Sequence, residues 1–318
     1  MRPEVSLIIP THNRCACLRR ALDAAARQQL PVEQYEIIVV DNGSSDDTRA
    51  LVTAQARQIL NLRYVYEPQP GLNVARNRGW REARGEIVVY QDDDAIGSPA
   101  WLATYREVFN QVRPTPGCAG GAIAPIWECP RPAWLPDHML QYLTLLDYAP
   151  EPTVFPSGRW IYGANMAYPR SVLQEFNGFR EGLDRRGGNL LSGGEVELQR
   201  RLQARGLPFY YHPRAAVRHL VPAERLRQQW FFRRLYWDGV TETLLARAVK
   251  PATLGNRLRF IYWNTMRLLQ HPQRLLWSLW PVGPSAEGFG RKCSALFTLG
   301  AWMGAWRRLP TWADGREP

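Results

Sequence analysis

The 318-residue sequence lacks several features that define specialised classes of protein. Its five cysteines include no C-x-x-C pair, which argues against a structural zinc site and favours free thiols in a reducing compartment. No run reaches the ~20 apolar residues that span a bilayer. The N-terminus leads directly into the strand-like Val5–Ile9, so we expect no signal peptide there.

The charge is also unevenly distributed along the chain. The formal net charge is +11, and residues 225–318 hold 15 Arg and Lys against 5 Asp and Glu, together with 8 of the 13 tryptophans. Residues 1–224 are nearly neutral. We therefore predict a boundary near residue 224, with a basic, Trp-rich helical region from 225 to 318.

A nucleic-acid-binding module would account for the positive charge and the interleaved aromatic residues. The even charge balance of residues 1–224 argues against that class, and the sequence contains no familiar nucleic-acid motif. We predict no nucleic-acid partner.

Short apolar runs alternate with helical patterns in the first half of the chain. Val5–Ile9, Tyr35–Val40, Leu62–Tyr66 and Glu86–Tyr90 are typical of buried strands, and single predicted helices separate them. This order predicts an α/β fold with a mostly parallel sheet and helices on both faces. Ligands bind at the carboxyl ends of the strands in such sheets.

Three further local features are predicted. Gly85 is expected to end the helix Asn73–Arg84 as a C-cap, and Glu195–Arg205 is expected to form an amphipathic helix that ends at Gly206. Two short strands, at 209–211 and 215–219, are expected to follow.

The clearest chemical feature is the aspartate run Asp92-Asp93-Asp94, which follows the fourth predicted strand. Adjacent carboxylates repel one another unless a cation neutralises them. Carboxylate oxygens next to a diphosphate suit Mg²⁺ or Mn²⁺. The alternative is a solvated acidic turn.

Other polar residues follow the first two predicted strands. Asp41 ends the second strand and can accept a hydrogen bond from a nucleobase or ribose. The run Thr11-His12-Asn13-Arg14 follows the first strand and is expected to line the same crevice. The alternative for these residues is a turn or a helix cap.

Two later positions add a cation and an imidazole. Arg76 lies on the helix that opens at Gly71, where it can reach a phosphate, and Asn77 can brace a neighbouring loop. His219 lies on a predicted strand and can complete an aspartate-based metal site. The alternatives are a solvated helix face for Arg76 and a core or surface role for His219.

Glu195 and Glu197 begin the later amphipathic helix. A carboxylate there is favoured by the helix dipole and can act as a general base toward a sugar hydroxyl. Residues two apart point to different faces of a helix, so we expect only one of the two to face a pocket. The sequence leaves open which one is the base, and the alternative is that both acids only complement the helix dipole.

Taken in order, these motifs resemble the family 2 glycosyltransferases, which are inverting enzymes with a GT-A type, Rossmann-like fold. The resemblance covers roughly residues 5–221 and is carried by six blocks. These are V-S-L-I-I-P-T-H-N-R, I-I-V-V-D-N-G-S-S-D-D-T, P-G-L-N-V-A-R-N-R-G, V-V-Y-Q-D-D-D-A, I-Y-G-A-N-M-A-Y-P-R and G-G-E-V-E-L-Q-R-R-L.

The resemblance implies a catalytic domain over residues 1–224 that moves a sugar from a nucleotide-diphosphate sugar to a glycan or lipid-linked acceptor, with Mn²⁺ or Mg²⁺. It implies surface polysaccharide or glycolipid synthesis. One departure is Gly194-Glu195, where the family commonly has Glu-Asp. The implied roles are nucleoside contacts for Thr11 and Asp41, ribose and metal contacts for Asp92, and metal ligation by Asp94, with Asp93 between the two aspartates. Asn13, Arg76 and Asp93 are counted with these residues as donor-binding. Glu195 is the implied general base, and His219 is a further metal or diphosphate contact.

Two other functions remain open on the same fold. One is a catalytically inactive scaffold, against which the intact aspartates argue. The other is a nucleotidyltransferase that makes the sugar nucleotide. Such enzymes usually carry a Gly-rich basic loop after the first strand, and residues 10–14 do not resemble one.

Within the basic region, Cys293–Trp306 forms an apolar segment with cationic flanks. It is too short to span a bilayer but suits a position in the bilayer interface, where the flanks would favour anionic cytoplasmic lipids. We therefore expect a cytoplasmic protein that associates peripherally with the membrane. The alternative is a helical subdomain that packs its aromatic residues internally.

Overall fold

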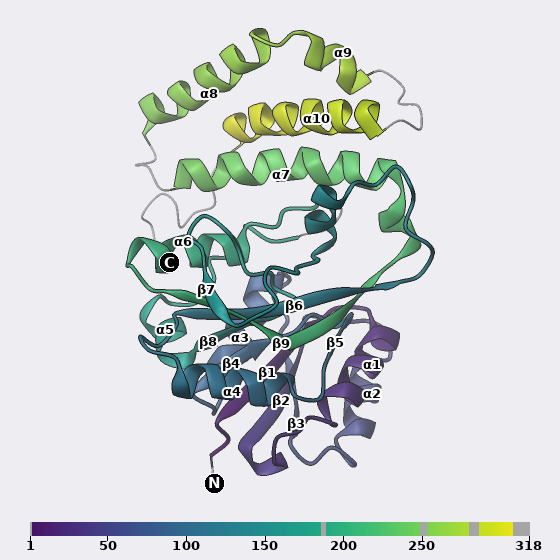
Figure 1. Ribbon diagram of the computed structural model, residues 1–318, viewed down its shortest axis with the longest axis vertical. Coiled ribbons are helices and arrows are strands. Elements are labelled where there is room, and N and C mark those ends of the chain that lie inside the picture. The colour runs from purple at the N-terminus through teal and green to yellow at the C-terminus, as the bar shows by residue number, and fades with distance from the viewer. Residues whose placement is uncertain (1, 186–188, 249–252, 280–285, 308–318) are drawn as a thin grey trace. The chain divides into compact units, whose positions relative to one another are not determined.

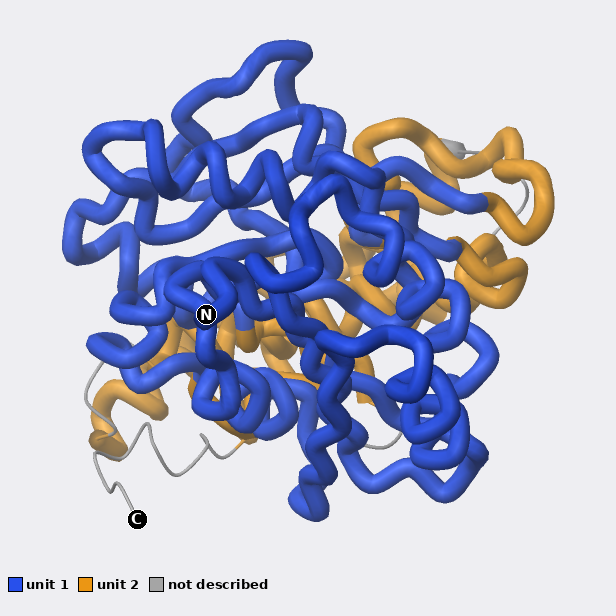
Figure 2. The backbone as a smooth tube through the Cα atoms, turned by 90° about the horizontal axis from the view of Figure 1, so that it is seen from below, with its two compact units in different colours: residues 1–126, 144–179, 195–220 blue, residues 127–143, 180–194, 221–318 orange. Residues whose placement is uncertain are grey.

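The computed structural model describes residues 2–185, 189–248, 253–279 and 286–307 (Figure 1). The chain divides into two compact units (Figure 2). Unit 1 comprises residues 1–126, 144–179 and 195–220, and unit 2 comprises 127–143, 180–194 and 221–318. Unit 2 thus takes in two segments besides the basic region, and the functional boundary near residue 224 stays a prediction.

Unit 1 is built on one mixed sheet, as predicted. Its first four strands are parallel, and the strand order is β3-β2-β1-β4-β8-β6-β9-β5, with β7 paired to β9. Strand β8 runs antiparallel to β4 and β6, and β5 and β7 run antiparallel to β9. The strands are β1 (Val5–Thr11), β2 (Tyr35–Asp41), β3 (Leu62–Tyr66), β4 (Ile87–Tyr90), β5 (Ala95–Gly97), β6 (Cys118–Trp127), β7 (Thr153–Phe155), β8 (Met166–Pro169) and β9 (Phe209–Val221).

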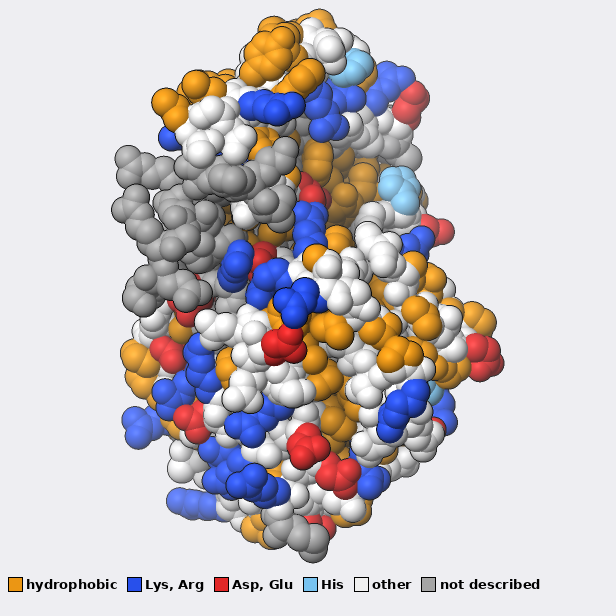
Figure 3. Space-filling view, turned by 90° about the vertical axis from the view of Figure 1, so that its left-hand side faces the viewer, with side chains coloured by type: hydrophobic (Ala, Val, Ile, Leu, Met, Phe, Trp, Pro, Cys, Tyr) orange, Lys and Arg blue, Asp and Glu red, His pale blue; other side chains and the backbone are white. Residues whose placement is uncertain are grey.

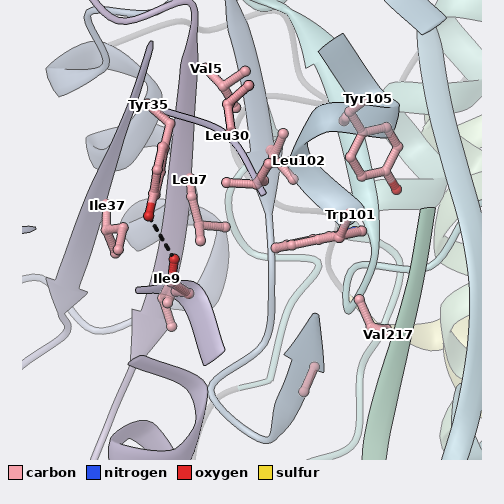
Figure 4. Close-up of a cluster of buried hydrophobic side chains, with 14 of the residues drawn as sticks. Val5, Leu7, Ile9, Leu30, Tyr35, Ile37, Trp101, Leu102, Tyr105 and Val217 are labelled. Carbon is pink, nitrogen blue, oxygen red and sulfur yellow. Dashed lines mark hydrogen bonds between the residues drawn. The ribbon is translucent and has the colours of Figure 1, made fainter. Parts of the chain in front are cut away.

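Both faces of the parallel strands are buried, which explains their nearly continuous apolar sequences. Leu7, Ile9 and Ile37 contribute to one core cluster with Trp101 and neighbouring helix residues (Figure 4). The opposite cluster includes alternate residues of the same strands. Helices α1 (Cys15–Ala25), α2 (Thr48–Gln55) and α4 (Trp101–Gln111) cover the first face, and α3 (Leu72–Glu82), α5 (Arg170–Glu175) and α6 (Gly194–Ala204) cover the second.

The strand order reverses between β1 and β4. The chain moves outward from β1 through β2 to β3 and then returns to β4 on the other side of β1. Such a reversal opens a crevice at the carboxyl ends of the strands. Thr11 ends β1, and the aspartate run follows β4, so both reach this edge.

Strand β9 brings a distant segment to the same edge. Ala95 of β5 lies opposite His219 of β9, and the Leu220 amide donates to the Asp94 carbonyl at 2.9 Å. The two short strands predicted at 209–211 and 215–219 are therefore wrong as separate elements, because β9 is continuous.

The predicted role of Gly85 is also wrong. Helix α3 ends at Glu82, and the Gly85 amide donates to Ser6 Oγ at 2.9 Å. A Cβ at Gly85 would lie 2.8 Å from the backbone of β1, so close packing explains this glycine. Gly206 follows α6 with a φ of +76°, as expected for the end of a helix.

Unit 2 contains the predicted C-terminal helices. They are α7 (Gln228–Ala248), α8 (Leu254–Leu269), α9 (Gln273–Leu279) and α10 (Ala286–Trp306). Short 3-10 helices lie at Val32–Gln34, Asp137–Leu143 and Ala223–Leu226. Among the described helices, none is long and apolar enough to cross a membrane.

Helix α10 packs closely on α7. A Cβ at Gly300 would collide with the Tyr236 carbonyl, and one at Gly239 would collide with the Phe297 carbonyl. Several α10 side chains, including Cys293, are buried. For Cys293–Trp306 the structure therefore favours internal packing over the interfacial position predicted from its sequence.

Candidate active site at the sheet edge

Asp92, Asp94 and His219 come together at the carboxyl edge of unit 1. Each offers one ligand atom, and these atoms all lie within 4.8 Å of one another. His219 Nε2 lies 3.2 Å from Asp94 Oδ1, and only 2% of each of these two side chains is exposed. Carboxylate oxygens and an imidazole nitrogen form a donor set that binds divalent cations such as Mn²⁺.

The middle aspartate is held by other partners. Thr11 Oγ1 donates to Asp93 Oδ2 at 2.8 Å, and Arg14 Nη1 donates to Asp93 Oδ1 at 2.8 Å. Burial raises the pKa of Asp93 to about 7, although Arg14 opposes this shift. The donor contacts predicted for Thr11 and Asp93 stay predictions, since these two side chains bond to each other.

From the sequence, Arg14 is expected in the crevice with Thr11, His12 and Asn13, but without a role of its own. Its second amino group lies 2.9 Å from Asp94 Oδ2, so one guanidinium bridges Asp93 and Asp94. Such a cation offsets the repulsion between two adjacent buried carboxylates. Its bridging role could have been predicted, because Arg14 comes three residues after the end of β1, at the edge where the aspartates were expected.

Arg76 is buried rather than solvated. Its guanidinium lies 3.3 Å from Glu195 Oε2 and 3.9 Å from Asp92 Oδ1, and its side chain is 3% exposed. Burial alone would lower the pKa of Arg76, but Glu195 and Asp92 outweigh burial and raise that pKa. A Cβ at position 163 would collide with this guanidinium, so Gly163 provides the room for it.

The two glutamates of α6 point to different partners, as their spacing predicts. Glu195 shares Arg76 with Asp92. Glu197 instead lies 3.0 Å from Arg201, four residues later on the same helix. The geometry therefore joins Glu195, and not Glu197, to the aspartate site.

The loops after β1 and β2 are tied together. Asn13 Oδ1 accepts from the Ser45 amide at 2.7 Å. The buried Asp41 carboxylate accepts from the Ser44 amide at 2.8 Å and from the Tyr64 hydroxyl at 2.7 Å. A carboxylate has about four acceptor positions, so Asp41 retains capacity for a ligand. The donor contacts predicted for Asn13 and Asp41 stay predictions.

The bracing role predicted for Asn77 is confirmed. Its Nδ2 donates to the Phe179 carbonyl at 2.7 Å, and its Oδ1 accepts from the Phe179 amide at 2.9 Å. This pair fixes the Phe179 ring, whose centroid lies 5.5 Å from the Arg76 guanidinium carbon.

A parallel Rossmann-like half-sheet with an acidic cluster at its strand reversal defines the class of nucleotide-binding α/β proteins. Residues 6–176 match the glycosyl transferase family 2, which is more than half of the chain. The chain belongs to this family.

Two curated relatives illustrate the similarity. A validoxylamine A glucosyltransferase of Streptomyces hygroscopicus subsp. jinggangensis is 28% identical over 232 residues, which cover 65% of this chain and 53% of the relative. A glucosyl-dolichyl phosphate glucuronosyltransferase of Haloferax volcanii is 24% identical, over 76% of this chain and 77% of the relative. The chain thus spans about half the length of the first relative.

Solved structures share the GT-A fold. A mannosyltransferase from Pyrobaculum calidifontis in complex with GDP-Man and Mn²⁺ aligns over 96% of this chain and 88% of its own, with a TM-score of 0.60 and 21% identity. The TarS protein of S. aureus, residues 1–349 in complex with UDP, aligns over 75% of this chain and 65% of its own, with a TM-score of 0.51 and 20% identity.

Proposed function

We propose that residues 1–224 catalyse inverting transfer of a sugar from a nucleotide-diphosphate donor to an acceptor hydroxyl. One observation carries the proposal. At the sheet edge, Arg76 links a three-residue cluster of metal-ligand type to Glu195, which comes from a separate helix. Family membership supports the reaction class.

Asp92, Asp94 and His219 fit a divalent cation. Within the described part of the chain, His219 Nδ1 is buried without a hydrogen-bond partner, a costly arrangement for an imidazole that only fills the core. Mn²⁺ or Mg²⁺ bound there would stabilise negative charge on a leaving nucleoside diphosphate.

Glu195 is the proposed general base. It takes the proton from the acceptor hydroxyl while the acceptor oxygen attacks the anomeric carbon from the face opposite the diphosphate. The bond between that carbon and the diphosphate oxygen breaks as the new glycosidic bond forms. Arg76 positions Glu195 through the 3.3 Å contact.

Thr11, Asn13, Asp41 and Asp93 are proposed to form the donor crevice. The GDP-Man and UDP complexes of proteins with this fold support a nucleoside-diphosphate donor. The glucosyl-dolichyl phosphate in the name of the Haloferax relative supports a lipid-linked acceptor and a role in glycolipid or surface polysaccharide synthesis. We place this reaction on the cytoplasmic side.

A matched pair of substitutions tests the base. Glu195→Gln should lower transfer by roughly 10²–10⁴-fold, the range for lost general base catalysis, while donor still raises the melting temperature. Glu197→Gln, two residues along the same helix, should lower transfer far less. Near-normal turnover in Glu195→Gln would remove that residue from the role.

A donor screen tests the reaction class. Thermal shifts with UDP-, GDP-, dTDP- and CDP-sugars plus Mn²⁺ should identify one preferred nucleotide, and that donor should then be hydrolysed or transferred. Binding without turnover would indicate an inactive scaffold. Release of pyrophosphate from a nucleoside triphosphate and a sugar phosphate would indicate a nucleotidyltransferase.

A further inference from the structure

The outer face of α8 carries apolar side chains that point away from the rest of unit 2. Leu254, Leu258, Tyr262 and Leu269 lie on one side of the helix, with Trp263 beside them, and each is between 55% and 70% exposed. Leu254, Leu258, Tyr262 and Leu269 recur at intervals of four and seven residues, so these four form a continuous stripe. An amphipathic helix normally turns such a stripe toward the core, and here it points outward.

Contacts on the inner side of α8, beside the stripe, fix this orientation. Trp302 Nε1 of α10 donates to Thr265 Oγ1 at 3.0 Å, and an Arg257 amino group donates to the Trp306 carbonyl at 2.9 Å. Leu268 is buried on this inner side. Helix α8 is therefore anchored to α10 with its apolar stripe outward.

Helix α9 extends the exposed apolar surface. Leu276 and Leu279 are 67% and 83% exposed, and Leu275 is exposed as well. Figure 3 shows hydrophobic side chains gathered together with basic ones at the top of the view, and α8 and α9 are labelled at the top of Figure 1. Below, the α8–α9 face means the exposed residues Leu254, Leu258, Tyr262, Trp263, Leu269, Leu275, Leu276 and Leu279.

The charged residues of α8 and α9 are all arginines. No acidic residue occurs between Glu242 and Glu287, whereas six Arg and Lys residues do. Arg259 and Arg267 are exposed on α8 itself. Long cationic side chains can extend toward phosphate groups while their stems lie along apolar surface.

We propose that the α8–α9 face docks on an anionic lipid bilayer, with the Leu side chains in the acyl boundary and the arginines at the headgroups. Tyr and Trp side chains favour that boundary. Among the described helices none can cross the bilayer, so α8 and α9 lie along its surface. A second copy of the chain fits less well, because a symmetric contact would oppose like charges.

Vesicle flotation of the full chain tests the apolar contribution. The variant Leu258→Ser/Trp263→Ser/Leu276→Ser should partition into vesicles of phosphatidylglycerol and phosphatidylcholine at least about tenfold less than the wild type, because it removes apolar area that enters the lipid. The control is Leu60→Ser/Val154→Ser, which removes two apolar residues of unit 1 that are 85% and 62% exposed and should bind as the wild type does.

The cationic contribution is tested separately. Arg259→Gln/Arg267→Gln should weaken binding to anionic vesicles by roughly fivefold for each arginine and leave the weak binding to pure phosphatidylcholine unchanged. Quenching by brominated lipid should also be smaller for Trp263→Phe than for the wild type, since Trp263 is placed at the lipid.

Three results would overturn the proposal. One is equal binding to anionic and neutral vesicles, and another is wild-type binding by the apolar triple variant. The third is a wild-type dimer, measured by light scattering, that the triple variant converts to a monomer without any vesicle binding. All these measurements omit donor and acceptor, so they stand apart from the test of transferase activity.

Discussion

Two regions of this molecule reverse the usual distribution of side chains, in opposite directions. The sheet edge of unit 1 buries charge, including Arg76, Asp93 and Asp94, whereas the α8–α9 face of unit 2 exposes large apolar side chains. Buried charge and exposed apolar surface are the informative departures in a soluble protein. Both regions therefore call for a physical explanation.

The two regions differ in where their partners lie. At the sheet edge the compensating groups belong to the chain, because Arg14 bridges two aspartates and Arg76 lies between Asp92 and Glu195. On the α8–α9 face the exposed fractions show that the described chain leaves the apolar atoms in contact with water. None of the described residues covers that face, so its partner has to be sought beyond them. The predictions below test this difference.

The largest effect is expected from removing the buried cation. Arg76→Met leaves Asp92 and Glu195 without it, so we expect a loss of about 3 kcal/mol in the free energy of unfolding and at least roughly 100-fold in transfer. Urea denaturation measures the loss of stability, and a transfer assay measures the loss of activity. The control is Arg78→Met on the same helix, whose exposed pair with Glu82 should contribute less than about 1 kcal/mol. Similar losses in both variants would contradict the special role of Arg76.

A slightly smaller effect is expected from the metal. Mn²⁺ at 100 times its dissociation constant should stabilise the wild type by about 2.7 kcal/mol, seen as a higher melting temperature. Asp94→Asn should abolish this increment. Asp93→Asn should keep it, because Asp93 bonds to Thr11 and Arg14 rather than joining the ligand cluster. An increment that survives in Asp94→Asn would exclude that ligand.

These residues also show how far the sequence predicts the site. The parallel strands and the aspartates at their edge were predictable, because burial on both faces leaves a continuous apolar run that stops where the strand ends. The burial of Arg76 was not, since it depends on the missing Cβ of Gly163, which lies far away in sequence. The pairing of Ala95 with His219 is likewise a tertiary register that no local pattern contains.

The basic region also shows that a local sequence pattern does not predict which tertiary contacts a segment makes. An apolar segment such as Cys293–Trp306 has the same composition whether it meets lipid or another helix. The neighbouring element decides whether the segment meets lipid or another helix. Here the glycines of α7 and α10 allow the backbones of these two helices to approach closely. The less uniformly apolar helix α8 is the one that exposes its apolar stripe.

Adding a side chain where α10 packs on α7 should have the next largest effect. Gly300→Val introduces a Cβ against the Tyr236 carbonyl, so we expect a loss of about 2 kcal/mol in the free energy of unfolding. Gly255→Val on α8 is the control, since a Cβ there meets nothing within 4 Å. Differential scanning calorimetry compares the two. Equal melting temperatures for the variants would contradict close packing of α7 on α10.

The smallest effect is expected where apolar residues are exposed. Leu258→Ser/Trp263→Ser should change the free energy of unfolding in solution by less than about 0.5 kcal/mol for each residue, because these side chains bury little area when the chain folds. Leu268→Ala, on the inner side of the same helix, should cost about 2 kcal/mol or more. If the outer pair cost as much as Leu268, the face would be packed within the protein. A negligible cost together with lost vesicle binding would instead show that this face contributes to contact with the membrane and little to the stability of the fold.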